Sequence, residues 1–246
     1  MRLLSVVLVA LIAIIYSVSD LHWFDRRPVE RLLFIGHSYT YYNDMPAMVG
    51  EIADSAGSPV RYDITMSAFP NAKLAEHWRY PKTHRLLKQG GWDRIVAQPE
   101  GSFRPLGTDS EMYVYGRKLL VGTAKQPPAL IISHRATDTF YETHYSISRS
   151  EDGELDQENV RGLASETGAE VIDINRVWES VRSGDLPFSL YSDGNHPSVQ
   201  GSYLIALVVY AALSKSNVAN VSYVPRGMTE AEGKLLRDRV RAVLGG

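Results

Sequence analysis

The sequence predicts a three-layer α/β/α domain around a central five-stranded parallel sheet, and two observations lead to this fold class. From Arg31 onward, short apolar runs alternate with longer amphipathic segments, which is the pattern of successive strand, helix, strand units. The chain also has 246 residues, of which 44% are hydrophobic, enough to bury one substantial core and not obviously two.

The short apolar runs are the predicted strands. They are 31–36, 60–66, 94–98, 129–133 and 170–174. The amphipathic segments between and after them are the predicted helices, which are 44–56, 74–89, 110–125, 157–167, 175–183, 197–215 and 229–244. The polar, glycine-containing stretch 148–158 is predicted to be a mobile loop.

The N-terminus carries an apolar run over residues 3–18, preceded by Arg2 and followed by the small-x-small pattern Ser17-Val18-Ser19. This pattern predicts an export signal that is cut after Ser19. The run is also close to the roughly 20 residues that span a bilayer, so a retained anchor and a buried helix are the alternatives. We expect residues 1–19 to be a signal peptide or membrane anchor, 20–30 a linker and 31–246 the folded domain. With either a signal or an anchor, the domain is exported, periplasmic or held on the outer side of the cytoplasmic membrane.

The composition excludes several classes of function. The formal charge is -2 and no run of Lys or Arg is present, which argues against a nucleic-acid partner or a polybasic membrane surface. The chain has no cysteine, which removes thiol catalysis, disulfides and cysteine-based zinc sites. His134 and His144 lack the spacing of a metal motif, so no metal or other cofactor is expected.

A catalytic dyad is predicted near the C-terminus, in Asp193-Gly194-Asn195-His196-Pro197. A carboxylate held against one ring nitrogen of an imidazole fixes its tautomer and leaves the other nitrogen free to accept a proton. The best-placed nucleophile is Ser38, which follows the first predicted strand directly after Gly36 and His37. Pro197 at the start of the next helix fixes the direction in which His196 projects.

Parallel-sheet geometry brings further candidates to the same place. Ser38, Asn71, Gln98 and His134 each follow a different predicted strand. Ligands of open parallel sheets bind beyond the carboxyl ends of the strands, so these side chains should line one edge. Aromatic residues also gather near the strand ends, where they suit sugar rings or acyl chains as well as an ordinary core. They are Tyr39, Tyr41, Tyr42, Trp78, Phe103, Tyr141 and Tyr145.

The segment around Ser38 and the segment 193–197 together resemble the SGNH (GDSL-like) hydrolase superfamily, and the resemblance spans roughly residues 31–213. The resemblance implies a flavodoxin-like fold, with Ser38 as nucleophile, His196 as base and Asp193 as the acid that orients it. His37 is a departure, because it replaces the Asp or Asn of the family's Gly-Asp-Ser or Gly-Asn-Ser. The Gly-x-Ser-x-Gly elbow of α/β-hydrolases is absent, because Tyr39 and Thr40 follow the serine.

The family's two middle blocks, which supply oxyanion donors, match less closely. Asn71 stands where the family has a glycine, and Gln98 lies near the position of its asparagine. Both are therefore expected to bind the oxyanion or the substrate. The alternatives are that Asn71 is a turn residue after Pro70 and that Gln98 is a buried amide which satisfies backbone groups.

The resemblance implies a serine esterase that hydrolyses small acyl esters, and export suggests O-acetyl groups on a carbohydrate. The expected partner is a small-molecule or glycan ester, with residues 3–18 as a possible membrane tether. Two alternatives stay open. One is an acyltransferase that uses the same triad, and the other is a catalytically silent carbohydrate-binding protein, which the unusual middle blocks suggest.

Overall fold

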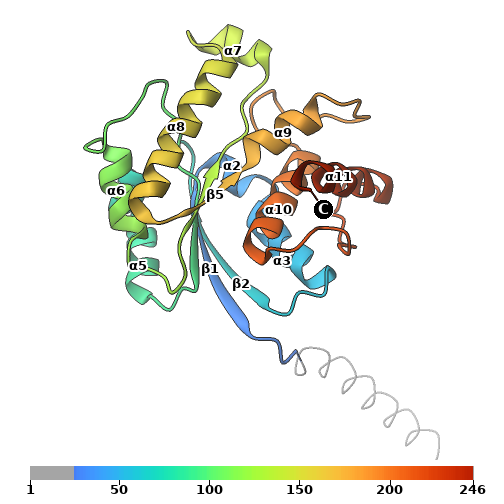
Figure 1. Cartoon of the computed structure of the whole chain (residues 1–246), viewed down its shortest axis with the longest axis horizontal. Coiled ribbons are helices and arrows are strands. Elements are labelled where there is room, and N and C mark those ends of the chain that lie inside the picture. The colour runs from blue at the N-terminus through green and yellow to red at the C-terminus, as the bar shows by residue number, and fades with distance from the viewer. Residues whose placement is uncertain (1–24, 246) are drawn as a thin grey trace, which may run out of the picture.

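The computed structural model describes residues 25–245 and has five parallel strands in the order β2-β1-β3-β4-β5. The strands are β1 (Val29–Gly36), β2 (Arg61–Ala68), β3 (Arg94–Ala97), β4 (Ala129–Ile132) and β5 (Glu170–Asp173). Helices cover both faces of this sheet (Figure 1). The predicted three-layer α/β/α fold is therefore confirmed.

The two faces of β1 enter two separate cores, because successive side chains of a strand point to opposite sides. Leu32 and Phe34 belong to one core cluster, whereas Leu33 and Ile35 belong to the other. All four side chains are almost fully buried. The part of a strand that is covered on both faces is apolar at successive positions, which explains the continuous hydrophobic run from Leu32 to Ile35.

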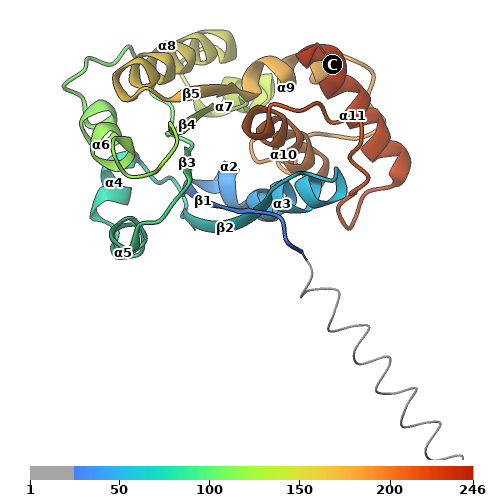
Figure 2. The same ribbon diagram turned by 60° about the horizontal axis from the view of Figure 1, so that its bottom comes forward.

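Each face has its own set of helices, as Figure 2 shows. The larger core is covered by α3 (Met45–Ser55), α9 (Ile174–Arg182), α10 (Val199–Ser214) and α11 (Glu230–Leu244). The other core is covered by α4 (Leu74–Arg79), α5 (Pro81–Gln89), α6 (Glu111–Leu120) and α8 (Arg149–Thr167). Short helical segments not predicted from the sequence lie at the carboxyl edge of the sheet, and they are α2 (Ser38–Tyr41), η1 (Tyr42–Asp44) and α7 (Asp138–His144).

The predicted single helix over 74–89 is wrong, because the structure has two helices there. Tyr80 is extended, with φ -76° and ψ 121°, and Pro81 opens α5. Proline disfavours a helical conformation in the residue before it, so the chain breaks at Tyr80 and restarts at Pro81.

The predicted mobile loop over 148–158 is also wrong, because these residues form the first part of α8. Ser148 caps the helix by accepting a hydrogen bond from the backbone N–H of Glu151. The buried face of this part is polar, since Asp152 and Asp156 both pair with the buried Arg135. Buried carboxylates gave the segment no apolar periodicity, and their partner lies in a distant part of the sequence.

The strand β1 begins two positions before the expected start of the domain, at Val29. The expected signal or anchor over residues 1–19 lies outside the described residues, and so does the first part of the expected linker, residues 20–24. Within 25–245, none of the helices combines the length and the apolar character needed to cross a membrane.

Candidate active site

Ser38 lies at the carboxyl edge of the sheet, where β1 ends and α2 begins. Gly36 makes this sharp entry possible, because a Cβ on it would lie 2.1 Å from Thr40 Oγ1. His37 is the extended residue before the helix, so Ser38 occupies the first helical position. The first N–H groups of a helix have no intrahelical acceptor, so the backbone N–H of Ser38 is free to bind an oxyanion.

The structure brings Ser38, His196 and Asp193 together in one chain of hydrogen bonds. His196 Nε2 is 3.1 Å from Ser38 Oγ, and His196 Nδ1 is 2.7 Å from Asp193 Oδ2. With Nδ1–H donating to the carboxylate, Nε2 has a free lone pair to accept the serine proton. This arrangement has the geometry of a nucleophile, base and orienting acid.

Asp193 is held in place by its own loop. Its Oδ1 accepts hydrogen bonds from the backbone N–H groups of Asn195, at 2.9 Å, and His196, at 2.7 Å. Burial by itself raises the pKa of Asp193, but the hydrogen bonds from His196 and Asn195 outweigh it and hold the pKa below its ordinary value. The carboxylate is therefore ionised at neutral pH and stabilises an imidazolium on His196.

Contacts with α2, with η1 and with the N-cap residue of α7 fix the loop that carries His196. The carbonyl of Gly194 accepts a hydrogen bond from the backbone N–H of Thr137 at 2.8 Å, and the Tyr39 hydroxyl bonds to Asn195 Oδ1. The ring of Tyr42 stacks on the imidazole of His196. These contacts join segments far apart in the sequence, so no local pattern predicted them.

A cavity of about 330 Å³ opens over the triad. Its wall contains Ser38 and His196 together with Asn71, so the structure places three of the predicted site residues around one space. The other residues of its wall are His37, Tyr39, Glu100, Gly101, Phe103, Ser133, Arg135, Ala136, Tyr141, Tyr145, Asp152 and Asn195. Polar groups and tyrosines dominate this wall, which suits a ligand with hydroxyl groups.

Asn71 has the backbone conformation that glycine favours, with a φ of 54°. Asparagine is one of the few other residues that adopt this left-handed region readily. Its backbone therefore fits a position where the resemblance implies a glycine. Asn71 remains a predicted oxyanion donor.

Gln98 is buried and does not contribute to the cavity wall. Its Oε1 accepts a hydrogen bond from Thr40 Oγ1 at 2.5 Å, and its Nε2 donates to Ser133 Oγ at 2.8 Å. Ser133 does line the cavity. The amide of Gln98 thus ties the helix of the nucleophile to the end of β4, and its predicted role toward substrate remains a prediction.

His37 and His134 are both buried beside the triad. Burial lowers the pKa of His37 to about 4 and that of His134 to about 3, so both rings are neutral at pH 7. His134 stacks on Trp178 with ring centroids 4.1 Å apart, and its Nε2 is 3.2 Å from the carbonyl of Asn195. His134 therefore contacts the loop that carries His196. His144 lies at the end of α7 and does not line the cavity.

A charged cluster that sequence reasoning missed forms one side of the cavity. Arg135 Nη1 donates to Asp152 Oδ2 at 2.7 Å, and Nη2 pairs with Asp156. The Tyr141 hydroxyl also bonds to Asp152. The only sequence signal was the position of Arg135 shortly after a predicted strand, since its partners lie in the segment expected to be a loop.

Among residues 25–245, no group of three or more His, Cys, Asp or Glu side chains is arranged to hold a metal ion. The arrangement at Ser38 can activate a hydroxyl by proton transfer to imidazole.

No protein-family model and no curated protein matches the sequence. The fold is similar to several solved structures. A DUF4886 family protein from Bacteroides uniformis has a TM-score of 0.68 and 16% identity, over 88% of this chain and 95% of that one. A candidate SGNH hydrolase from Slackia heliotrinireducens has a TM-score of 0.55 and 24% identity, over 75% of this chain and 99% of that one.

A variant of an acetyl xylan esterase from Geobacillus stearothermophilus is also similar in structure. Its TM-score is 0.55 and its identity 15%, over 81% of this chain and 99% of that one. At such identities the likeness shows a shared fold, the α/β fold of SGNH-type hydrolases, and activity has to be argued from the site.

Proposed function

We propose that this protein is an exported SGNH-type serine esterase that hydrolyses small acyl esters, with O-acetyl groups on a carbohydrate as its substrate class. The observation that carries the proposal is the continuous chain from Ser38 Oγ through the imidazole of His196 to Asp193. The fold shared with acetyl xylan esterases supports the substrate class. Export rests on the apolar run and cleavage pattern at the N-terminus.

The proposed reaction has two steps. Ser38 Oγ attacks the ester carbonyl carbon while its proton passes to His196 Nε2, and His196 then protonates the departing alkoxide. In the second step, water attacks the acyl group and gives a proton to His196, which returns it to Ser38 as the acid leaves. Asp193 holds the imidazole in the correct tautomer and stabilises its charged form in both steps.

The oxyanion that forms on the carbonyl needs hydrogen-bond donors. The backbone N–H of Ser38, at the start of α2, is the first candidate, and Asn71, which lines the same cavity, is the second. Removal of one such donor costs roughly 100- to 1000-fold in rate in well-studied hydrolases.

The test is hydrolysis of p-nitrophenyl acetate, butyrate and octanoate by the full chain in mild detergent, compared with its Ser38→Ala variant. We expect acetate to be the best substrate and the activity to vanish in the variant. The matched control is Ser58→Ala, because Ser58 is a buried serine outside the cavity wall whose hydroxyl, among the described residues, accepts only from the backbone N–H of Val60. Equal rates in the wild type and Ser38→Ala would overturn the proposal.

A further inference from the structure

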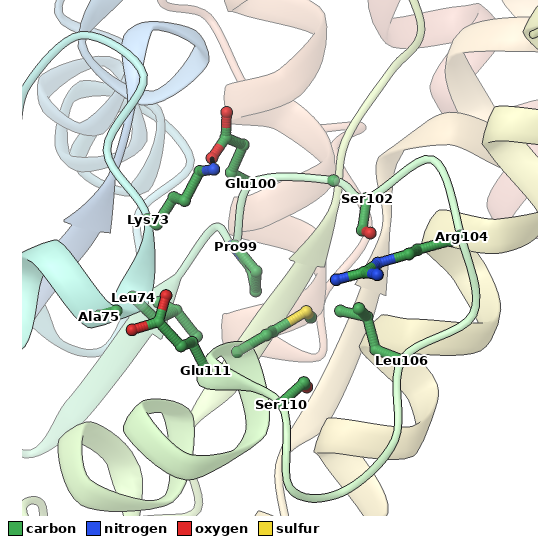
Figure 3. A pocket seen from close by; sticks show the side chains of 12 residues that line it. Lys73, Leu74, Ala75, Pro99, Glu100, Ser102, Arg104, Leu106, Ser110 and Glu111 are labelled. Atoms are coloured by element: carbon green, nitrogen blue, oxygen red, sulfur yellow. Dashed lines mark ion pairs between the residues drawn. The ribbon is translucent and has the colours of Figure 1, made fainter.

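A second cavity of about 260 Å³ lies directly beside the cavity of the triad. It is enclosed by the start of α4, the start of α6 and the loop after β3, as Figure 3 shows. Glu100 and Gly101 line both cavities, so the two cavities are neighbours that share part of their wall. A chain-like molecule bound at Ser38 that extends past Glu100 and Gly101 therefore reaches the second cavity.

The lining of the second cavity combines apolar and polar side chains. Leu74, Pro99, Leu106 and Met112 supply the apolar part. Figure 3 shows the guanidinium of Arg104 reaching in over the cavity between Ser102 and Leu106. Sugar rings combine apolar C–H faces with a rim of hydroxyl groups, so their chemistry matches this distribution.

The charged side chains that line the second cavity have both signs. Lys73 and Arg104 carry positive charge, and Glu100 and Glu111 carry negative charge. Glu111 is paired with Arg79 at 3.2 Å, and Lys73 Nζ lies 3.8 Å from Glu100 Oε2. Arg104 has no ion pair among the described residues, so its guanidinium is free to donate hydrogen bonds to oxygen atoms of a ligand.

Two polar atoms of this cavity have no hydrogen-bond partner among the described residues. They are Glu100 Oε2 and Ser110 Oγ, and both atoms are buried. Ser110 stands at the start of α6, yet its side chain makes no capping hydrogen bond. An alkyl chain would leave both atoms unsatisfied at a cost in free energy. Hydroxyl groups of a ligand can donate a hydrogen bond to Glu100 Oε2 and form one with Ser110 Oγ.

We infer that the second cavity is a subsite for the sugar unit next to the acylated one, so that the substrate is an oligosaccharide rather than a single acetylated sugar. The inference rests on the proposed function, because the acylated unit has to lie at Ser38. Glu100, which lines both cavities, accepts a hydrogen bond from a hydroxyl group of the bound chain, and Arg104 donates hydrogen bonds to hydroxyl oxygens. Binding energy from this remote unit is available to the reacting centre.

The test measures kcat/KM for O-acetylated mono-, di- and trisaccharides of the xylose and glucose series, divided by the rate of the same protein on p-nitrophenyl acetate. We expect a gain of roughly tenfold from monosaccharide to disaccharide in at least one series, the effect of one or two added hydrogen bonds. Ser110→Trp fills the second cavity and should abolish this gain. Ser102→Trp, from the loop after β3, is a second filling variant in case the first does not fold.

Thr108→Trp is the matched control, because Thr108 is exposed in the same loop and does not line the cavity. It should keep the gain. The inference is overturned by a gain that survives both filling variants, by equal rates at every chain length, or by hydrolysis of p-nitrophenyl acetate without that of any acetylated sugar. If the wild-type protein shows no hydrolysis of any ester beyond that of Ser38→Ala, the proposed function itself is overturned.

Discussion

The imidazole of His196 lies face to face with the ring of Tyr42, with centroids 4.2 Å apart and planes within 4° of parallel. Tyr42 belongs to the turn that follows the nucleophile helix, so this contact couples the base to the segment of Ser38. Side chains locked in this way keep catalytic atoms at a productive separation.

Replacement of Tyr42 by Leu should therefore lower kcat by about tenfold, since the imidazole loses the ring that orients it. KM should change little, because Tyr42 does not line the cavity. Tyr42→Phe keeps the stacked ring and should keep kcat. Steady-state kinetics on p-nitrophenyl acetate provide the measurement, and a kcat for Tyr42→Leu equal to that of the wild type would contradict the positioning role.

Asn71→Gly tests which part of Asn71 binds the oxyanion. Glycine adopts the φ of 54° without strain, so the backbone N–H stays in place while the side-chain amide is lost. We expect the variant to retain most of its kcat, because the resemblance implies a backbone donor here. A fall of about 100-fold with an unchanged melting temperature would identify the side-chain amide as the donor instead.

Gln98→Leu should lower stability more than it lowers the activity of the folded protein. The substitution leaves the buried hydroxyls of Thr40 and Ser133 without their amide partner, at a cost of about 1–3 kcal/mol for each unsatisfied group. Urea unfolding and kcat measured on the same preparation separate the two effects. An unchanged unfolding free energy with a rate loss of about 100-fold would show that Gln98 acts on the oxyanion.

His37→Asn should make stability less sensitive to acid. Burial lowers the pKa of His37 from 6.5 to about 4, so between these values the unfolded chain binds a proton that the folded one does not. The unfolding free energy therefore falls as pH drops from 6.5 to 4, by about 3 kcal/mol for one such group, and no penalty exists above this range. Urea unfolding at pH 7.5 and 5 should show a smaller loss in the variant than in the wild type, and an equal loss would contradict the prediction. His134 remains in both proteins and keeps part of the dependence.

Arg135→Met should destabilise the protein by about 3–5 kcal/mol, because it leaves Asp152 and Asp156 buried without their positive partner. Arg104→Met is the control, since Arg104 is exposed and has no ion pair among the described residues. The melting temperature should fall clearly in the first variant and change little in the second. Similar melting temperatures in both would show that the buried cluster does not stabilise the fold.

The sequence by itself determined the order of strands and helices, because strands buried on both faces appear as apolar runs and the helices between them as amphipathic segments. It also placed Ser38, Asp193 and His196 at loops that the parallel sheet brings to one edge. Local patterns were enough to find these residues, because the effects of Gly36, of the Asp193–His196 spacing and of Pro197 extend over only a few residues.

Tertiary structure decided what depends on partners distant in sequence. The stacking of Tyr42 on His196, the direction of the Gln98 amide and the helix that carries Asp152 all follow from contacts across the fold. The segment 148–158 was predicted as a loop because its buried face is polar, and only Arg135, which follows β4, makes that burial favourable. A buried charge is stable only beside its partner, and the position of that partner is a property of the folded chain.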